Sequence, residues 1–240
     1  MIPLKDENPT RRRPYVTYAL IAVNVIVFVS QLGYSPQQLQ RVFLEQALVP
    51  ALVTRSPFSV ETFLDFIRSM FFHGGWMHLL GNMLYLWIFG DNIEDRMGRA
   101  LYLLVYFVSG FVAGLAQILI APESPIPLVG ASGAIAGVLG SYALMFPGVK
   151  VRGIILLGYF GRIAEIPALY VLGFWFVIQL FDGLLSLGAA TATGGVAFFA
   201  HIGGFIAGLV MTWLFLQISP TPIDERQAWL YRRSGRYSND

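Results

Sequence analysis

Hydrophobic positions in this chain form long uninterrupted stretches and do not alternate with polar ones. Six stretches contain no Asp, Glu, Lys or Arg, and they are residues 15–34, 69–90, 100–122, 124–149, 166–181 and 183–223. A helix needs about 20 mainly apolar residues to cross a hydrocarbon core about 30 Å thick. Because lipid cannot satisfy backbone polar groups, such stretches must form helices or barrel strands, and continuous apolarity favours helices.

The pattern therefore predicts an all-α membrane protein with six transmembrane helices. We expect these spans at residues 15–33, 76–91, 100–121, 130–147, 167–187 and 196–218. Together they would form one membrane domain over 15–218. Residues 1–14 and 219–240 are polar, and we expect them to be tails.

Two connections between the predicted spans have features of their own. Residues 34–75 mix charged and apolar positions, which suggests short amphipathic helices lying on the membrane. The apolar run 153–161 is too short to cross as a helix, so we expect it at the membrane interface.

Composition and charge support a membrane location and give an orientation. Of the 240 residues, 56% are apolar and 12% are charged, which excludes an ordinary soluble domain. With the N-terminus inside, only Arg41, Arg55 and Arg68 of the 16 Lys and Arg residues fall outside. Both termini are therefore expected in the cytoplasm, with the protein in a cell (plasma or inner) membrane. The first span is longer than a signal-peptide core and no A-x-A site follows it, so we expect it to be retained.

A few polar residues inside apolar stretches are the candidate chemistry. Ser132 lies in the sequence Gly-Ala-Ser-Gly at the start of the fourth span, and His201 lies within the sixth. An imidazole in a span is costly and marks a function or an internal pair. His78 and Asn82 are four residues apart on one face of the second span. The structural alternatives are a serine bonded to its own helix and polar side chains that join neighbouring helices.

Pairs of small residues predict where the helices touch. Pairs separated by three positions allow backbones to approach closely, and they occur at Gly110 and Gly114, Gly133 and Gly137, and Gly204 and Gly208. His201 shares a helix face with the last pair, so it should point at a neighbouring helix.

The second, fourth and sixth spans run in the same direction, so residues near their starts share the outer half of the membrane. A neutral His201 can take the proton of Ser132 and make it a nucleophile without an acid. The resulting negative oxygen needs hydrogen-bond donors. Backbone N–H groups at Ser132, near a helix N-terminus, and the side chains of His78 and Asn82 could supply them.

Two other arrangements can be considered for the same residues. The three histidines could indicate a zinc site, but His73 and His78 are five residues apart, not on one helix face, and no H-E-x-x-H motif is present. We expect His73 to shape the loop before the second span. Asp182 could orient His201, although its span runs in the opposite direction. The absence of cysteine excludes disulfides, zinc–thiolate sites and thiol catalysis.

These residues occur in an order that resembles the rhomboid family of intramembrane serine proteases. The resemblance spans most of 15–218 and rests on segments 72–82, 130–133 and 200–204, with further similarity at 90–92 and 98–99. It implies a six-helix rhomboid fold and a water-filled cavity open to the outside. It also implies lateral substrate access near spans two and five and cleavage of transmembrane segments of other proteins.

For the site, the resemblance implies a Ser132–His201 dyad with oxyanion donors at His78, Asn82 and Ser132. Gly130, Gly133, Gly204 and His73 are expected to support the site. No cofactor, metal or nucleic acid is expected, and the partners are transmembrane substrates and membrane lipid. The chain departs from many relatives at Ala136, where they have a tyrosine that packs on the histidine, and it lacks an adjacent Trp-Arg in the external loop.

Two other functions fit parts of the pattern. A non-catalytic relative would bind transmembrane clients without cutting them, but such relatives typically lack the serine or the histidine. A channel or transporter would use the intramembrane polar residues as an ion or solute path.

Overall fold

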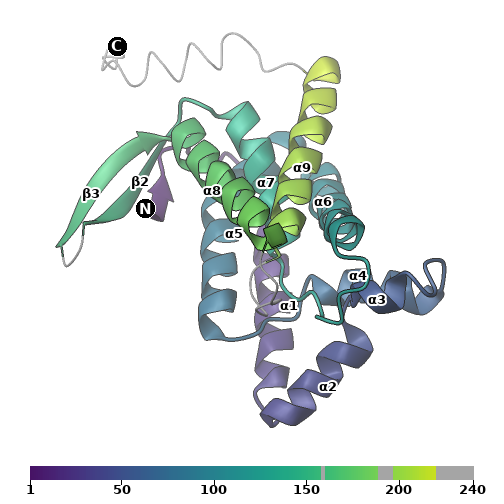
Figure 1. Ribbon diagram of the computed structural model, residues 1–240. Helices are drawn as coiled ribbons and strands as arrows, with labels where there is room; N and C mark the ends of the chain where they lie inside the picture. Colours follow the sequence, from purple (N-terminus) through teal and green to yellow (C-terminus); the bar gives the residue numbers. More distant parts are fainter. Residues whose placement is uncertain (158–159, 189–196, 220–240) are drawn as a thin grey trace, which may run out of the picture.

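A computed structural model describes residues 1–157, 160–188 and 197–219, and it is mainly helical (Figure 1). The long helices are α1 (Tyr15–Gln31), α5 (Trp76–Met97), α6 (Arg99–Ile120), α7 (Ser132–Met145), α8 (Ala168–Gly188) and α9 (Phe198–Ile218). Each of them coincides with one predicted span. Among the described residues, α6, α8 and α9 are long and apolar enough to cross a membrane. The chain is therefore a membrane protein, and membrane crossing by α1, α5 and α7 stays a prediction.

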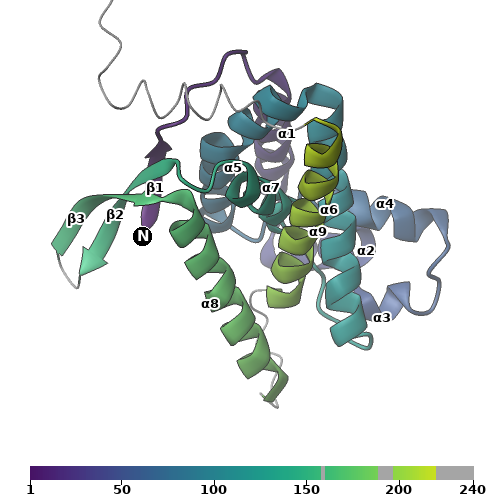
Figure 2. The same cartoon turned by 90° about the horizontal axis from the view of Figure 1, so that it is seen from above.

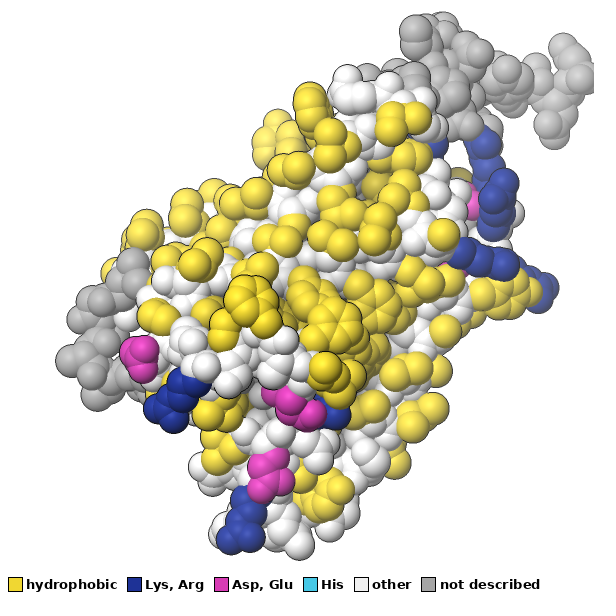
Figure 3. Space-filling view, turned by 90° about the vertical axis from the view of Figure 1, so that its right-hand side faces the viewer, with side chains coloured by type: hydrophobic (Ala, Val, Ile, Leu, Met, Phe, Trp, Pro, Cys, Tyr) yellow, Lys and Arg dark blue, Asp and Glu magenta, His cyan; other side chains and the backbone are white. Residues whose placement is uncertain are grey.

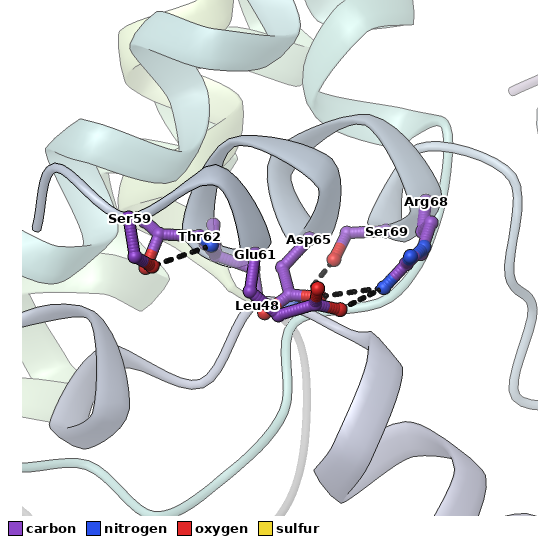
Figure 4. Close-up of polar contacts among 7 residues, drawn as sticks. All are labelled: Leu48, Ser59, Glu61, Thr62, Asp65, Arg68 and Ser69. Carbon is purple, nitrogen blue, oxygen red and sulfur yellow. Dashed lines mark hydrogen bonds and ion pairs between the residues drawn. The ribbon is translucent and has the colours of Figure 1, made fainter. Parts of the chain in front are cut away.

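Three short helices fill the long connection between α1 and α5. They are α2 (Pro36–Gln46), α3 (Pro50–Val53) and α4 (Val60–Ser69). Ser59 caps α4 by accepting a hydrogen bond from the Thr62 backbone N–H at 3.0 Å, and Arg68 pairs with Glu61 and Asp65 of the same helix (Figure 4). The predicted helices are present, and their contact with a membrane surface stays a prediction.

The expectation of a purely helical protein is wrong in one region. Strands β2 (Lys150–Leu157) and β3 (Phe160–Pro167) form an antiparallel hairpin, and β1 (Ile2–Asp6) pairs with β2. Residues 153–157 of the run 153–161 thus belong to strand β2, and the location of this run at the membrane interface stays a prediction. At the start of β2, the buried Val151 and Gly153 flank the exposed Arg152, and such alternation is the period of a strand.

Strand β1 also means that residues 1–14, expected to be a tail, include a folded segment. The buried Asp6 carboxylate accepts hydrogen bonds from Tyr142 Oη at 2.5 Å and Asn92 Nδ2 at 3.0 Å, which fastens β1 to α7 and α5. Burial, reinforced by the nearby Asp91, raises the pKa of Asp6 to about 7. Residues 220–240, nearly all of the predicted C-terminal tail, lie outside the described residues.

The core of the helical bundle is a close contact between α7 and α9. A Cβ atom added to Gly204 would lie 2.0 Å from the Gly133 carbonyl oxygen, and one added to Gly208 would lie 1.9 Å from that of Gly137. Any side chain at these positions would collide with backbone, so the predicted contacts between small residues are confirmed here. We call this contact, formed by Gly133, Gly137, Gly204 and Gly208, the glycine seam.

Helix α8 follows the hairpin directly and is packed less closely than α7 or α9. It contacts both of these helices, yet its far end stands away from the rest of the bundle (Figure 2). Hydrophobic side chains are spread widely over the face drawn in Figure 3, between two groups of charged side chains at its margins. Exposed residues on α9 such as Ile206, Val210 and Trp213 are of the kind that lipid covers.

Candidate active site

The structure brings Ser132 and His201 into direct contact. Ser132 is the first residue of α7, and His201 lies in the first turn of α9. Nε2 of His201 is 2.8 Å from Oγ of Ser132, a hydrogen-bonding distance. The glycine seam begins one residue after Ser132, at Gly133, and it holds the two helices close enough for this bond.

The helix start at Ser132 supplies backbone hydrogen-bond donors. Residues in the first turn of a helix have N–H groups without intrahelical acceptors, and Ala131, the N-cap of α7, provides no side-chain cap. The loop before it is tied to the α2–α4 region, because Gly130 N–H donates to the Ser69 carbonyl and Leu128 N–H donates to the Leu48 carbonyl, each at 2.8 Å. The α2–α4 region thus fixes the position of the serine.

Gly130 leaves a space that His78 and Ser132 border from two sides. Its φ is +128°, a conformation that favours glycine, and an added Cβ would lie 2.6 Å from Nε2 of His78 and 3.5 Å from Oγ of Ser132. The His78 ring has no hydrogen-bond partner among the described residues. It is therefore free to donate into this space.

Asn82 is held by His73. Its Nδ2 donates to Nε2 of His73 at 2.9 Å, while Nδ1 of His73 donates to the Phe71 carbonyl at 3.2 Å. Gln31 of α1 bonds both backbone groups of His73. Burial, with a contribution from the nearby His78, lowers the pKa of His73 to about 4, which keeps the ring neutral and able to accept. An amide nitrogen carries two hydrogens, so this bond leaves one free on Asn82.

The second nitrogen of His201 bonds a residue that the sequence pattern did not single out. Nδ1 of His201 is 2.6 Å from Oε1 of Gln179 on α8, and the Trp175 ring lies 5.8 Å from the imidazole, centroid to centroid, with 35° between the planes. Gln179 is the single carboxamide in the charge-free stretch 166–181, which is the signal that could have identified it.

Asp182, the acid considered for this role, does not reach the histidine. It is half-buried, and it makes no hydrogen bond or ion pair with any residue that the structure describes. Ala136, on α7, is fully buried, and its methyl side chain has no polar atom or ring to offer the imidazole. Among the described residues, the bond to Nδ1 and the aromatic contact of His201 both come from α8.

A small cavity lies beside Ser132 on the side facing the α2–α4 region. Its volume is about 50 Å³, and its lining includes Phe66, Ser69, Ala113 and Gly133. This is enough space for water next to the serine hydroxyl. Within the described ranges, no group of three or more His, Cys, Asp or Glu side chains is arranged to hold a metal ion.

Comparisons with known proteins indicate the family of the chain. The family model described as the Rhomboid domain matches residues 60–218. The Arabidopsis thaliana "Rhomboid-like protein 11, chloroplastic" is 24% identical over 92% of this chain and 72% of its own length.

Two further relatives are longer than the segment they share with this chain. The yeast "Rhomboid protein 1, mitochondrial" is 30% identical over 82% of this chain and 52% of its own length. The Bacillus subtilis "Rhomboid protease GluP" is 27% identical over 82% of this chain and 34% of its own length. The chain thus spans about half and about a third of these two relatives.

Proposed function

The chain belongs to the rhomboid family of intramembrane serine proteases, and on that premise we propose that it cleaves transmembrane segments of other membrane proteins. Ser132 is the nucleophile and His201 the general base in this proposal. The observation that carries it is the 2.8 Å hydrogen bond between Nε2 of His201 and Oγ of Ser132.

Acylation begins at this bond. As Oγ of Ser132 forms a bond to the carbonyl carbon of the scissile peptide, its proton passes to Nε2 of His201. The carbonyl oxygen takes the negative charge of the tetrahedral intermediate. His201 then returns the proton to the departing amine nitrogen, and an acyl-enzyme ester remains on Ser132. Water attacks that ester with His201 again as base, which releases the new carboxyl end and restores the serine hydroxyl.

The negative oxygen would be stabilised in the space beside Gly130. In this proposal the donors are backbone N–H groups at the start of α7, the His78 ring beside Gly130 and the free hydrogen of Asn82. Removing one such donor typically lowers kcat by about 100-fold or more. Gly130, Gly133, Gly204 and His73 support the site by leaving space, by allowing close helix contact and by holding Asn82.

In the membrane, we place the site in the outer half and both termini in the cytoplasm. The six long helices over 15–218 would each cross the bilayer, with lipid around them. Supporting this, Ser132, His201, His78 and Asn82 all lie near the starts of their helices, and most basic residues fall on the opposite side. The proposed chemistry requires no metal, cofactor or nucleic acid.

The test compares the wild type with Ser132→Ala and His201→Ala on a purified transmembrane-segment substrate in detergent or liposomes. Cleavage should fall by at least about 1,000-fold in both variants. Ser30→Ala is the matched control, because the Ser30 hydroxyl is exposed and bonds its own helix, and it should cleave like the wild type. Equal cleavage by the wild type and both site variants would refute the proposal. Client binding without any cleavage would instead indicate a non-catalytic relative.

A further inference from the structure

Two side chains of α8 meet the imidazole of His201. Oε1 of Gln179 is 2.6 Å from Nδ1, and the Trp175 ring lies 5.8 Å from the imidazole, centroid to centroid. Both belong to α8 and are one helical turn apart. On α7, the residue one turn after Ser132 is Ala136, whose methyl side chain has no ring or polar atom to offer the imidazole.

The bond to Gln179 bears on which nitrogen of His201 carries the proton. A neutral imidazole has one N–H, and Nε2 can accept the serine proton only when that hydrogen is on Nδ1. A carbonyl oxygen facing Nδ1 can only accept, so it favours the Nδ1–H form. The same bond persists after His201 has taken the proton, because both ring nitrogens are then donors.

Burial makes this contact selective. Gln179 is 9% exposed, so little water is available to replace its oxygen as the partner of Nδ1. A buried donor without an acceptor is costly, and the ring could relieve that cost by moving its hydrogen to Nε2 or by rotating away from Ser132. Either change removes the base.

We propose that Gln179 is a positioning residue that acts from α8 to hold His201 in the Nδ1–H form, aimed at Ser132. This inference rests on the proposed Ser132–His201 dyad. The proposal also makes activity depend on the position of α8 against α7 and α9. An outward movement of α8 would remove both the Nδ1 acceptor and the Trp175 ring from His201.

The first test is kinetic and uses two substitutions with opposite expectations. Gln179→Met keeps a similar length and removes the amide acceptor, so kcat should fall by about 10- to 100-fold with little change in KM. Gln179→Glu restores an acceptor that cannot donate when ionised, so it should retain most of the activity. Its negative charge stabilises the imidazolium, so the acid limb of the kcat/KM profile should move to higher pH.

Two controls separate this effect from general perturbation. Gln217→Met makes the same change on α9, where the Gln217 amide bonds only its own helix, and it should leave kcat unchanged. His73 and His78 are titratable groups near the site, and neither changes in the variants used for the kinetic test. Asp182→Asn removes the neighbouring acid of α8 and should not move the pH profile.

The second test determines directly which ring nitrogen of His201 carries the hydrogen. The chain has three histidines, so nitrogen NMR of ring-labelled protein can resolve each of them, with His73→Ala and His78→Ala used for assignment. Wild-type His201 should carry its hydrogen on Nδ1, and Gln179→Met should populate the Nε2–H form. Wild-type kcat in Gln179→Met, an unshifted profile in Gln179→Glu, or an unchanged His201 spectrum in Gln179→Met would each overturn the inference.

Failure of the protease proposal would look different. In that case the wild type would cleave no faster than Ser132→Ala, whereas the NMR spectra would still report whether Gln179 sets the form of His201. Cleavage that depends on Ser132 but not on Gln179 would refute only the positioning role.

Discussion

Two helix contacts near the site differ in the groups that form them. The glycine seam joins α7 and α9 through their backbones, whereas α8 contacts the same two helices through side chains. At the seam, backbone lies against backbone. In the most apolar 18-residue stretch of α9, 39% of the stretch is buried, whereas in that of α8 the share is 22%. Contacts of α8 with α9 use ring side chains, such as Phe176 stacked on Phe205 at 4.7 Å between centroids. The seam fixes where Ser132 and His201 are, and the looser helix decides how His201 points.

The largest expected effect comes from placing bulk in the seam. Gly208→Ala puts a methyl group 1.9 Å from the Gly137 carbonyl oxygen, and backbone cannot yield as a side chain can. We expect overpacking to cost about 1–3 kcal/mol or more and to lower the midpoint of thermal unfolding in detergent. The matched change on α8, Gly173→Ala, meets nothing within 4 Å and should be tolerated. Similar midpoints for both variants would remove the distinction between the two regions.

A smaller effect, on kcat, is expected from substitution of Asn82, which His73 holds by a hydrogen bond. Asn82→Ala removes a proposed oxyanion donor, so kcat should fall by about 100-fold while KM changes little. Because the substitution leaves His201 and Gln179 in place, the pH profile of kcat/KM should keep its shape, unlike that of Gln179→Glu. Steady-state kinetics across pH measures both quantities. Unaltered kcat would exclude Asn82 from the oxyanion site.

The smallest effect, on the stability of the β1 attachment, concerns Asp6. This residue joins β1 of the sheet to α5 and α7 by hydrogen bonds. Its pKa is about 7 in the folded protein, compared with 3.8 ordinarily, so between these values the folded state keeps a proton that the unfolded state has lost. The attachment of β1 should therefore be strongest at low pH and weaken as pH rises from about 4 to about 7. Hydrogen exchange of the β1 amides, corrected for intrinsic rates, measures this. Asp6→Asn cannot ionise and should make protection independent of pH, and an unchanged pH dependence in that variant would assign it to another group.

Most of the fold could be predicted because hydrophobic runs report directly on helices in a membrane protein. All six long helices lie where charge-free stretches predicted them, and the glycine pairs at 133–137 and 204–208 identified the contact that brings Ser132 to His201. The hairpin was not predicted because the apolar run 153–161 was considered only as a helix too short to cross the membrane. In addition, β1, which pairs with the hairpin, lies about 150 residues away in the sequence. Long-range strand pairing leaves little local signal.

Within the site, residues with distinctive chemistry were predictable and their partners were not. Ser132, His201, His78 and Asn82 are polar residues in apolar helices. The structure brings Ser132 to His201, places His78 beside Gly130 and bonds Asn82 to His73. Gln179 carries no charge, so the sequence analysis considered the acid Asp182, three residues later, as the residue that orients His201. The rotation of α8 decides which of the two faces His201, and that rotation depends on packing with α7 and α9.

Reaction with a serine-directed fluorophosphonate, followed by mass mapping of the modified residue, tests most directly whether His201 activates Ser132. In the wild type we expect modification at Ser132, because among the described residues its hydroxyl alone bonds an imidazole nitrogen. Labelling should be lost in His201→Ala and retained in the control Ser30→Ala. Modification at another residue, or undiminished labelling of Ser132 in His201→Ala, would contradict the dyad.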